Sequence, residues 1–125
     1  MKTVKQEIKV QEFLYTYPTD RKKALEKVIS VMTKVTGETP AIWGKDIIGF
    51  GEMTYSNTKL KDQPFFKVGL RMAKNHMTLY LNAYHQGLMD YADLKGIKHG
   101  MGCYHIKKAH EKLDQVKALL KLSME

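Results

Sequence analysis

Hydrophobic residues recur at spacings of three and four near both ends of the chain, which is the periodicity of an amphipathic helix. The clearest such helix begins at Thr19 or Asp20 and ends at Gly37, a common helix stop. Its apolar residues share one face: Leu25, Val28, Ile29, Met32 and Val35. A weaker pattern predicts a helix over residues 4–14, and a further helix from about Ala109 closes the chain.

The middle of the chain alternates apolar and polar residues, as strands do when one of their faces is buried. Four segments show this alternation: residues 47–50, 52–56, 65–72 and 76–81. The short polar connections at 57–63 and 73–75 favour hairpins, so we predict an antiparallel meander. A short helix over 88–95 and a brief strand over 104–107 follow it.

Helices at both ends of a run of antiparallel strands predict an α+β domain with two layers. We expect an antiparallel sheet of about five strands, packed with the N- and C-terminal helices. The 125 residues are enough to bury one sizeable core and too few for two. Residues 1–125 are therefore expected to form a single domain.

The composition is that of an ordinary globular protein, with 43% hydrophobic and 27% charged residues. No apolar run approaches the roughly 20 residues that a membrane helix needs, and the N-terminus lacks the apolar region of a secretory signal. We therefore expect a cytoplasmic protein with no membrane partner. Cys103 is the single cysteine, which excludes an internal disulfide and a four-cysteine zinc site within one chain.

The chain is basic, with 21 lysine and arginine residues against 13 acidic ones, a formal charge of +8 and a pI near 9.5. Such a charge attracts nucleic acid or anionic surfaces at low salt. Only Arg21 and Arg71 are arginine, however, and specific recognition of bases and phosphates favours the arginine fork. Scattered lysines are more typical of a solvated surface, so non-specific nucleic-acid binding through lysines is a secondary alternative.

Glycines are concentrated beside aromatic and β-branched residues in two segments, 43–51 and 96–108. Such glycines mark places where the backbone turns or approaches another group closely. Neither segment continues into a P-loop or a dinucleotide-binding fingerprint, and bulges or tight turns are the simpler interpretation. No set of nucleophile, base and orienting residue accompanies them. The sequence therefore favours a protein without catalytic chemistry and without a cofactor.

A metal site is conceivable at His99, Cys103 and His105, because imidazole and thiolate are ligands of zinc, copper and iron. Cys103 and His105 would project from the same face of a strand, with His99 returning from the preceding loop. Against this, a lone cysteine is usually a small buried hydrophobic residue. We expect no metal and keep these residues as candidates for the alternative. Cys103 as a nucleophile would need an oriented base that the sequence does not supply.

The glycine-rich segments also carry a resemblance to a known family. Its motifs follow one another along nearly the whole chain: Thr36-Gly37-Glu38, Trp43-Gly44, Ile48-Gly49-Phe50-Gly51, Tyr55, Val68-Gly69-Leu70, Lys74, Thr78-Leu79-Tyr80-Leu81, Gly100-Met101-Gly102-Cys103 and Ile106-Lys107-Lys108. In this order the chain resembles the YdhG-like family, a bacterial domain of unknown function that includes a proposed frataxin-like iron chaperone. The resemblance implies a compact α+β fold with an antiparallel sheet.

The resemblance further implies a small binding domain whose pocket is rimmed by aromatic and basic side chains and shaped by glycines. The candidate pocket residues are Trp43, Gly49, Gly51, Tyr55, Lys74 and Tyr80. A small anionic ligand or a protein partner is the expected occupant, and a homodimer is compatible with this picture. A frataxin-like iron or metal chaperone is the alternative function, although the acidic residues are interleaved with lysines and form no acidic ridge.

Overall fold

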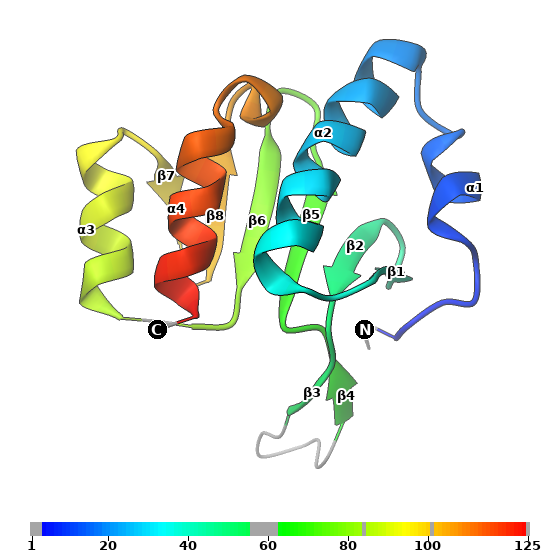
Figure 1. The fold of residues 1–125 in the computed structure, drawn as a ribbon, viewed down its shortest axis with the longest axis horizontal. Coiled ribbons are helices and arrows are strands. Elements are labelled where there is room, and N and C mark those ends of the chain that lie inside the picture. Colours follow the sequence, from blue (N-terminus) through cyan, green and yellow to red (C-terminus); the bar gives the residue numbers. More distant parts are fainter. Residues whose placement is uncertain (1–3, 56–62, 84, 101, 125) are drawn as a thin grey trace.

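A computed structural model describes residues 4–55, 63–83, 85–100 and 102–124. Six strands form one antiparallel sheet: β1 (Pro40–Trp43), β2 (Ile47–Phe50), β5 (Val68–Met72), β6 (Met77–Leu81), β8 (Cys103–Ile106) and β7 (Lys98–His99), in that order across the sheet. Two further strands, β3 (Met53–Tyr55) and β4 (Gln63–Phe65), pair only with each other and project from the sheet as a small hairpin (Figure 1).

The helices are α1 (Val10–Leu14), α2 (Thr19–Thr36), α3 (Gln86–Leu94) and α4 (Leu113–Ser123), with a 3-10 turn η1 (Ala109–Glu111) before α4. Helix α2 packs against α4, and α3 packs against α4 and β7. Figure 1 shows α2 and α4 lying across the same face of the sheet. The structure thus confirms an α+β fold in which an antiparallel sheet is packed with N- and C-terminal helices.

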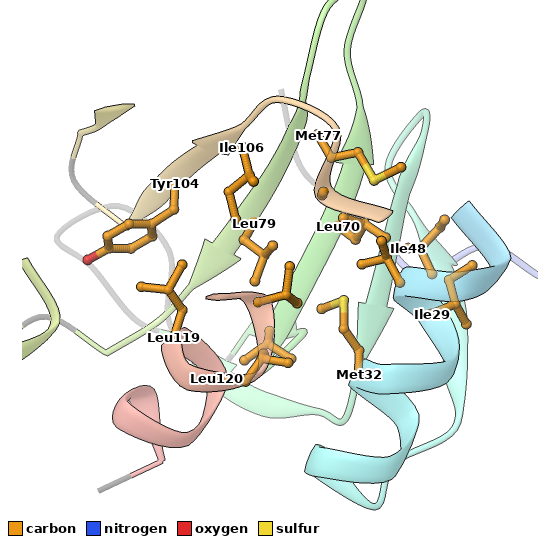
Figure 2. Packing of buried hydrophobic residues seen from close by; sticks show 14 of the residues in the cluster. Ile29, Met32, Ile48, Leu70, Met77, Leu79, Tyr104, Ile106, Leu119 and Leu120 are labelled. Carbon is orange, nitrogen blue, oxygen red and sulfur yellow. The ribbon is translucent and has the colours of Figure 1, made fainter. Parts of the chain in front are cut away.

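The core lies between this face of the sheet and the helices. Alternate strand residues point into it and meet side chains from α2 and α4 (Figure 2). None of the following is more than 1% exposed: Met32, Ile48, Leu70, Leu79, Tyr104, Ile106, Leu119 and Leu120. The alternation of β5, β6 and β8 therefore leaves their other side chains on the opposite face of the sheet.

Two predicted elements have the expected bounds. Helix α2 runs from Thr19 to Thr36, and Gly37 follows it with a φ of 70°, a left-handed conformation that glycine adopts without steric cost. Strand β2 covers residues 47–50 as predicted. These elements could be predicted because a clear period and a clear stop signal coincide in each.

The prediction of a helix over residues 4–14 is wrong for its first half, because only Val10–Leu14 is helical. The preceding segment is extended and runs beside β1: Lys5 bridges to Trp43, and the Gln6 amide donates to the Ile42 carbonyl at 2.7 Å. The backbone groups of this segment are satisfied by a strand far away in the sequence, which outweighs a weak helical period.

The predicted strand over 65–72 is divided, since β4 ends at Phe65 and β5 begins at Val68. The meander is also wrong at this point: β2 pairs with β5, with Phe50 opposite Val68, and the β3–β4 hairpin is inserted between them. Strands β1 and β7 were not expected, so the sheet has six strands rather than about five. The predicted C-terminal helix begins later, at Leu113, because Ala109–Glu111 forms the 3-10 turn.

Candidate functional site

The residues predicted to form one pocket lie at opposite ends of the sheet. Trp43, Gly49 and Gly51 line a shallow hollow of about 200 Å³ beside β1 and β2. Lys74 lies in the turn between β5 and β6, at the far end of the β2–β5 ladder. Tyr55 lies at the end of β3, and its side chain is outside the described part of the structure. The structure therefore does not bring Lys74 together with Trp43, Gly49 and Gly51.

Trp43 and Gly49 belong to a packed aromatic cluster rather than to an open cavity. Trp43 is 1% exposed, and its indole covers Gly49. Phe66 bridges Trp43 and Tyr80 through edge-to-face contacts, with ring centroids 6.0 and 6.1 Å apart. This cluster fills the sheet face opposite the helices at its β3–β4 end.

The hollow beside this cluster has an unfavourable charge for an anion. Its remaining lining includes Lys5, Glu38 and Glu52, and the Lys5 Nζ atom lies 3.3 Å from Glu52 Oε1. Two carboxylates therefore face one lysine that is already paired. An anionic ligand would therefore gain little electrostatic binding free energy in this hollow.

Tyr80 is part of a polar group on the same face of the sheet. The Arg71 Nε atom lies 3.1 and 3.0 Å from the two carboxylate oxygens of Asp46, and this contact raises the pKa of Arg71. Burial raises the pKa of Tyr80, although Arg71 beside it acts in the opposite direction. Tyr80 is therefore a neutral phenol near neutral pH, and Arg71 is engaged within the protein.

The structure also separates the candidate metal ligands. His99 lies opposite Tyr104 in the β7–β8 ladder and stacks on its ring, with Nε2 2.8 Å from Asp93 Oδ1. Cys103 and His105 alternate with Tyr104 and so project from the other face of β8. In the described ranges, no three His, Cys, Asp or Glu side chains are close enough to hold a metal ion.

A second arrangement of side chains is better suited to bind a charged molecule. A cleft of about 360 Å³ lies where α3 ends, β7 begins, β8 ends and α4 begins. We call it the lysine cleft, after the residues that line it: His76, Lys95, Gly96, Ile97, Lys98, His105, Ile106, Lys107, Lys112 and Gln115. Four of these residues are lysines and none is acidic, so the cleft carries a concentrated positive charge.

Local backbone geometry positions these lysines. Gly96 ends α3 with a φ of 69°, and the Ile97 amide donates to the Ala92 carbonyl at 2.8 Å. Ile97 is 6% exposed and anchors the turn, which leaves Lys95 and Lys98 exposed on either side of it. A buried apolar residue thus fixes two charged neighbours at the rim of the cleft.

Two histidines form the inner wall of the lysine cleft. The rings of His76 and His105 meet edge to face with centroids 4.9 Å apart, and His105 Nδ1 lies 3.1 Å from Thr78 Oγ1. Burial lowers the pKa of His76, and the nearby charges of His105, Arg71 and Lys107 lower it further. His76 is therefore largely neutral near neutral pH unless an anion enters the cleft.

A smaller cleft of about 230 Å³ shares His76 with the lysine cleft and is lined by the start of α2, the β5–β6 turn and η1. These three elements lie at the top of Figure 1. We call this smaller cleft the arginine cleft. Its polar lining residues are Asp20, Arg21, Lys74, Asn75, His76, Lys108 and His110. Arg21 Nη2 donates to the Lys74 carbonyl at 3.1 Å, and His110 Nδ1 is buried without a hydrogen-bond partner among the described residues.

Sequence reasoning named Lys74 as a ligand-binding residue but did not assign the other basic residues of the two clefts to an anion site. The lysines were interpreted as a scattered solvated surface, since they come from separate segments of the chain. Two signals were present: Lys95 and Lys98 flank a helix-ending glycine, and Lys107 and Lys108 close the last strand.

Comparisons with protein-family models, curated proteins and solved structures found no match to the chain. Among the described residues, no helix is both long and apolar enough to span a membrane.

Proposed function

We propose that this domain binds a small anionic ligand in the lysine cleft and performs no chemistry on it. The observation that supports the proposal is the lining of the cleft, in which four lysines and two histidines, and no carboxylate of the described residues, face one space. Its volume of about 360 Å³ lies within the range of small-molecule sites, which begins at roughly 300 Å³. The proposed ligand site therefore differs from the predicted pocket around Trp43 and Tyr80 and lies where α3, β7, β8 and α4 meet.

The side chains in the cleft are suited to hold an anion rather than to transform it. The lysines supply point charges with several donors each, and the Gln115 amide adds a neutral donor. The hydroxyl that contacts His105 of the cleft, Thr78 Oγ1, belongs to a residue that is 3% exposed, so a ligand has little access to it. Burial raises the pKa of Cys103, which keeps this thiol protonated and weakly nucleophilic.

We also propose that the chain is a YdhG-like domain, on the order of its sequence motifs. The α+β fold with an antiparallel sheet is consistent with this proposal. The two observations are separate, because the anion site rests on the lysine cleft alone.

Calorimetric titration with inorganic phosphate tests the binding proposal. The double variant Lys98→Gln with Lys112→Gln removes two charges from the cleft without shortening the side chains greatly. The matched control is Lys23→Gln with Lys27→Gln, two exposed lysines on the outer face of α2. A charge-assisted hydrogen bond contributes about 1.5–3 kcal/mol, so we expect the cleft variant to lose about tenfold or more in affinity.

The control variant should retain phosphate affinity within about twofold, since surface charges far from a site are screened by salt. Equal losses in the two double variants would show non-specific attraction to a basic protein and would contradict the proposal. Absence of phosphate binding by the unmodified protein, with the same result for sulfate and a phosphorylated sugar, would also reject it.

A further inference from the structure

The lysine cleft and the arginine cleft share a wall. His76 lines both, and the consecutive residues Lys107 and Lys108 are divided between them, with Lys107 in the lysine cleft and Lys108 in the arginine cleft. The wall is continuous with the sheet, because Met77 of the arginine cleft pairs with Ile106 of the lysine cleft across β6 and β8. The two clefts are therefore neighbouring parts of one edge of the molecule.

Positive charge continues across this wall. The arginine cleft adds Arg21, Lys74 and Lys108 to the four lysines of the lysine cleft. Within the part of the chain that the structure describes, Asp20 is the one acidic residue that lines either cleft. The exposed carboxylates of Glu111 and Asp114, which are close in sequence, line neither. A ligand that occupied only the lysine cleft would leave three cations of the arginine cleft with Asp20 as their one lining counter-charge among the described residues.

We propose that the ligand is an oligophosphate, an anion with at least two linked phosphate groups, which lies across His76 with one end in each cleft. The inference rests on the proposed function and extends it by naming the ligand class. The lysine cleft holds one phosphate group among Lys98, Lys107 and Lys112. The arginine cleft holds the next group beside Lys74 and Lys108.

The lining residues favour linked phosphates over a nucleic acid strand. Proteins that bind single strands combine a basic groove with aromatic side chains on which the bases stack. Apart from imidazoles, no aromatic side chain of the described residues lines either cleft. The clefts thus offer charge for phosphate groups and no stacking surface for bases.

A series of inorganic anions separates this inference from the proposed function. Phosphate, pyrophosphate and tripolyphosphate are titrated into the protein at constant ionic strength and without divalent cations. Linking two groups that bind neighbouring sites makes the second contact intramolecular, so affinity should rise about 100-fold from phosphate to tripolyphosphate. A rise no greater than that seen with the control anion pair acetate and citrate would overturn the inference.

Variants test whether the gain in affinity from phosphate to tripolyphosphate comes from the arginine cleft. In Lys74→Gln with Lys108→Gly, phosphate affinity should stay within about twofold and most of the roughly 100-fold gain should disappear. Lys23→Gln with Lys27→Gln has the same change in net charge and should retain the gain. Thermal unfolding of each variant without ligand shows that it is folded.

The possible outcomes are distinct. If the cleft variant Lys98→Gln with Lys112→Gln loses phosphate while the Lys74 and Lys108 variant keeps the tripolyphosphate gain, the single-anion site stands and the oligophosphate inference is overturned. If neither pair of variants affects any of the anions, both proposals are rejected. If a short single-stranded oligonucleotide displaces tripolyphosphate at equal phosphate concentration, the ligand class is nucleic acid and the inference is wrong.

Discussion

The indole of Trp43 occupies the space where a side chain at Gly49 would begin. A Cβ atom added to Gly49 would overlap Trp43 Cδ1 and would lie 2.7 Å from Phe66 Cβ. The backbone of Gly49 has no positive φ, so the requirement for glycine comes from its neighbours alone. Gly49, part of the glycine motif that suggested a ligand pocket, therefore makes room for the Trp43 indole.

Gly49→Ala should destabilise the fold by about 1–3 kcal/mol, since the added methyl group can be accepted only if the aromatic cluster shifts. Urea denaturation followed by tryptophan fluorescence measures the change, because Trp43 is the single tryptophan. Gly87→Ala is the control: it lies in α3, and its added Cβ would meet no atom closer than 3.5 Å. Equal stability of the two variants would contradict this account of Gly49.

His76 should make the stability of the fold depend on pH. Burial and neighbouring cations lower its pKa, so the unfolded chain, with a histidine pKa of about 6.5, takes up a proton more readily than the folded one. The resulting penalty appears as pH falls through about 6.5 and is complete below the folded-state pKa. We expect the melting temperature to fall more steeply over this range in the unmodified protein than in His76→Gln.

Parallel pH profiles for the two proteins would show that His76 does not contribute. The melting temperatures are compared with those of His76→Gln because carboxylates also titrate below about pH 6.5 and lower the stability of both proteins.

The same histidine should couple anion binding to pH. An anion in the lysine cleft favours the imidazolium form of His76, so binding takes up a proton and affinity rises as pH falls toward about 6. Sulfate is the appropriate probe, because its charge is constant over about pH 5–8. Calorimetry in buffers of different ionisation enthalpy measures the proton uptake, and zero uptake would argue against contact between the anion and His76.

Lys108 has a φ of 51°, a left-handed conformation that costs a residue with a Cβ about 1–2 kcal/mol. We expect Lys108→Gly to leave the free energy of unfolding unchanged or to raise it by up to about 1 kcal/mol, because glycine adopts this conformation freely. If Lys108 binds the ligand, tripolyphosphate affinity should fall in this variant even though its stability is unchanged or higher. Thermal unfolding and calorimetry on one sample compare the two effects, and a large loss of stability would show that the lysine side chain is structural.

Cys103 should react slowly with thiol reagents in the folded protein, because burial raises the pKa of its thiol and keeps the thiolate scarce at neutral pH. The rate with Ellman's reagent at about pH 7 should be lower in native buffer than in guanidinium. A faster reaction in the folded state would indicate an activated nucleophile and would reopen the question of catalysis.

The elements that could be predicted are those in which one segment carries its own signal. In α2 the apolar stripe and the stop at Gly37 agree, and in β6 the alternation from Met77 to Leu81 is unbroken. Strand β7 has only two residues, too few to show a period. Residues 4–6 are extended only because β1 lies beside them, which no local pattern encodes.

The candidate site was less predictable than the fold because its residues are far apart in the sequence. Lys95, Lys107 and Lys112 share a cleft only after α3, β8 and α4 meet at one end of the sheet. Along the sequence, their places beside a helix-ending glycine, after a strand and before a helix do not show that the three segments meet. The dense aromatic and glycine residues suggested a pocket, but Trp43 and Gly49 pack against each other and leave no cavity between them.

Both outer strands of the sheet are protected from pairing with another chain. On one side the extended residues 4–6 lie along β1, and the Gly44 amide donates to the Val4 carbonyl at 2.7 Å. On the other side β7 is two residues long and includes the charged Lys98. A long row of free backbone groups invites edge-to-edge aggregation, and short or charged edges prevent it. The lysine at the rim of the proposed site thus has a second effect: it helps to keep a concentrated solution of this protein from aggregating.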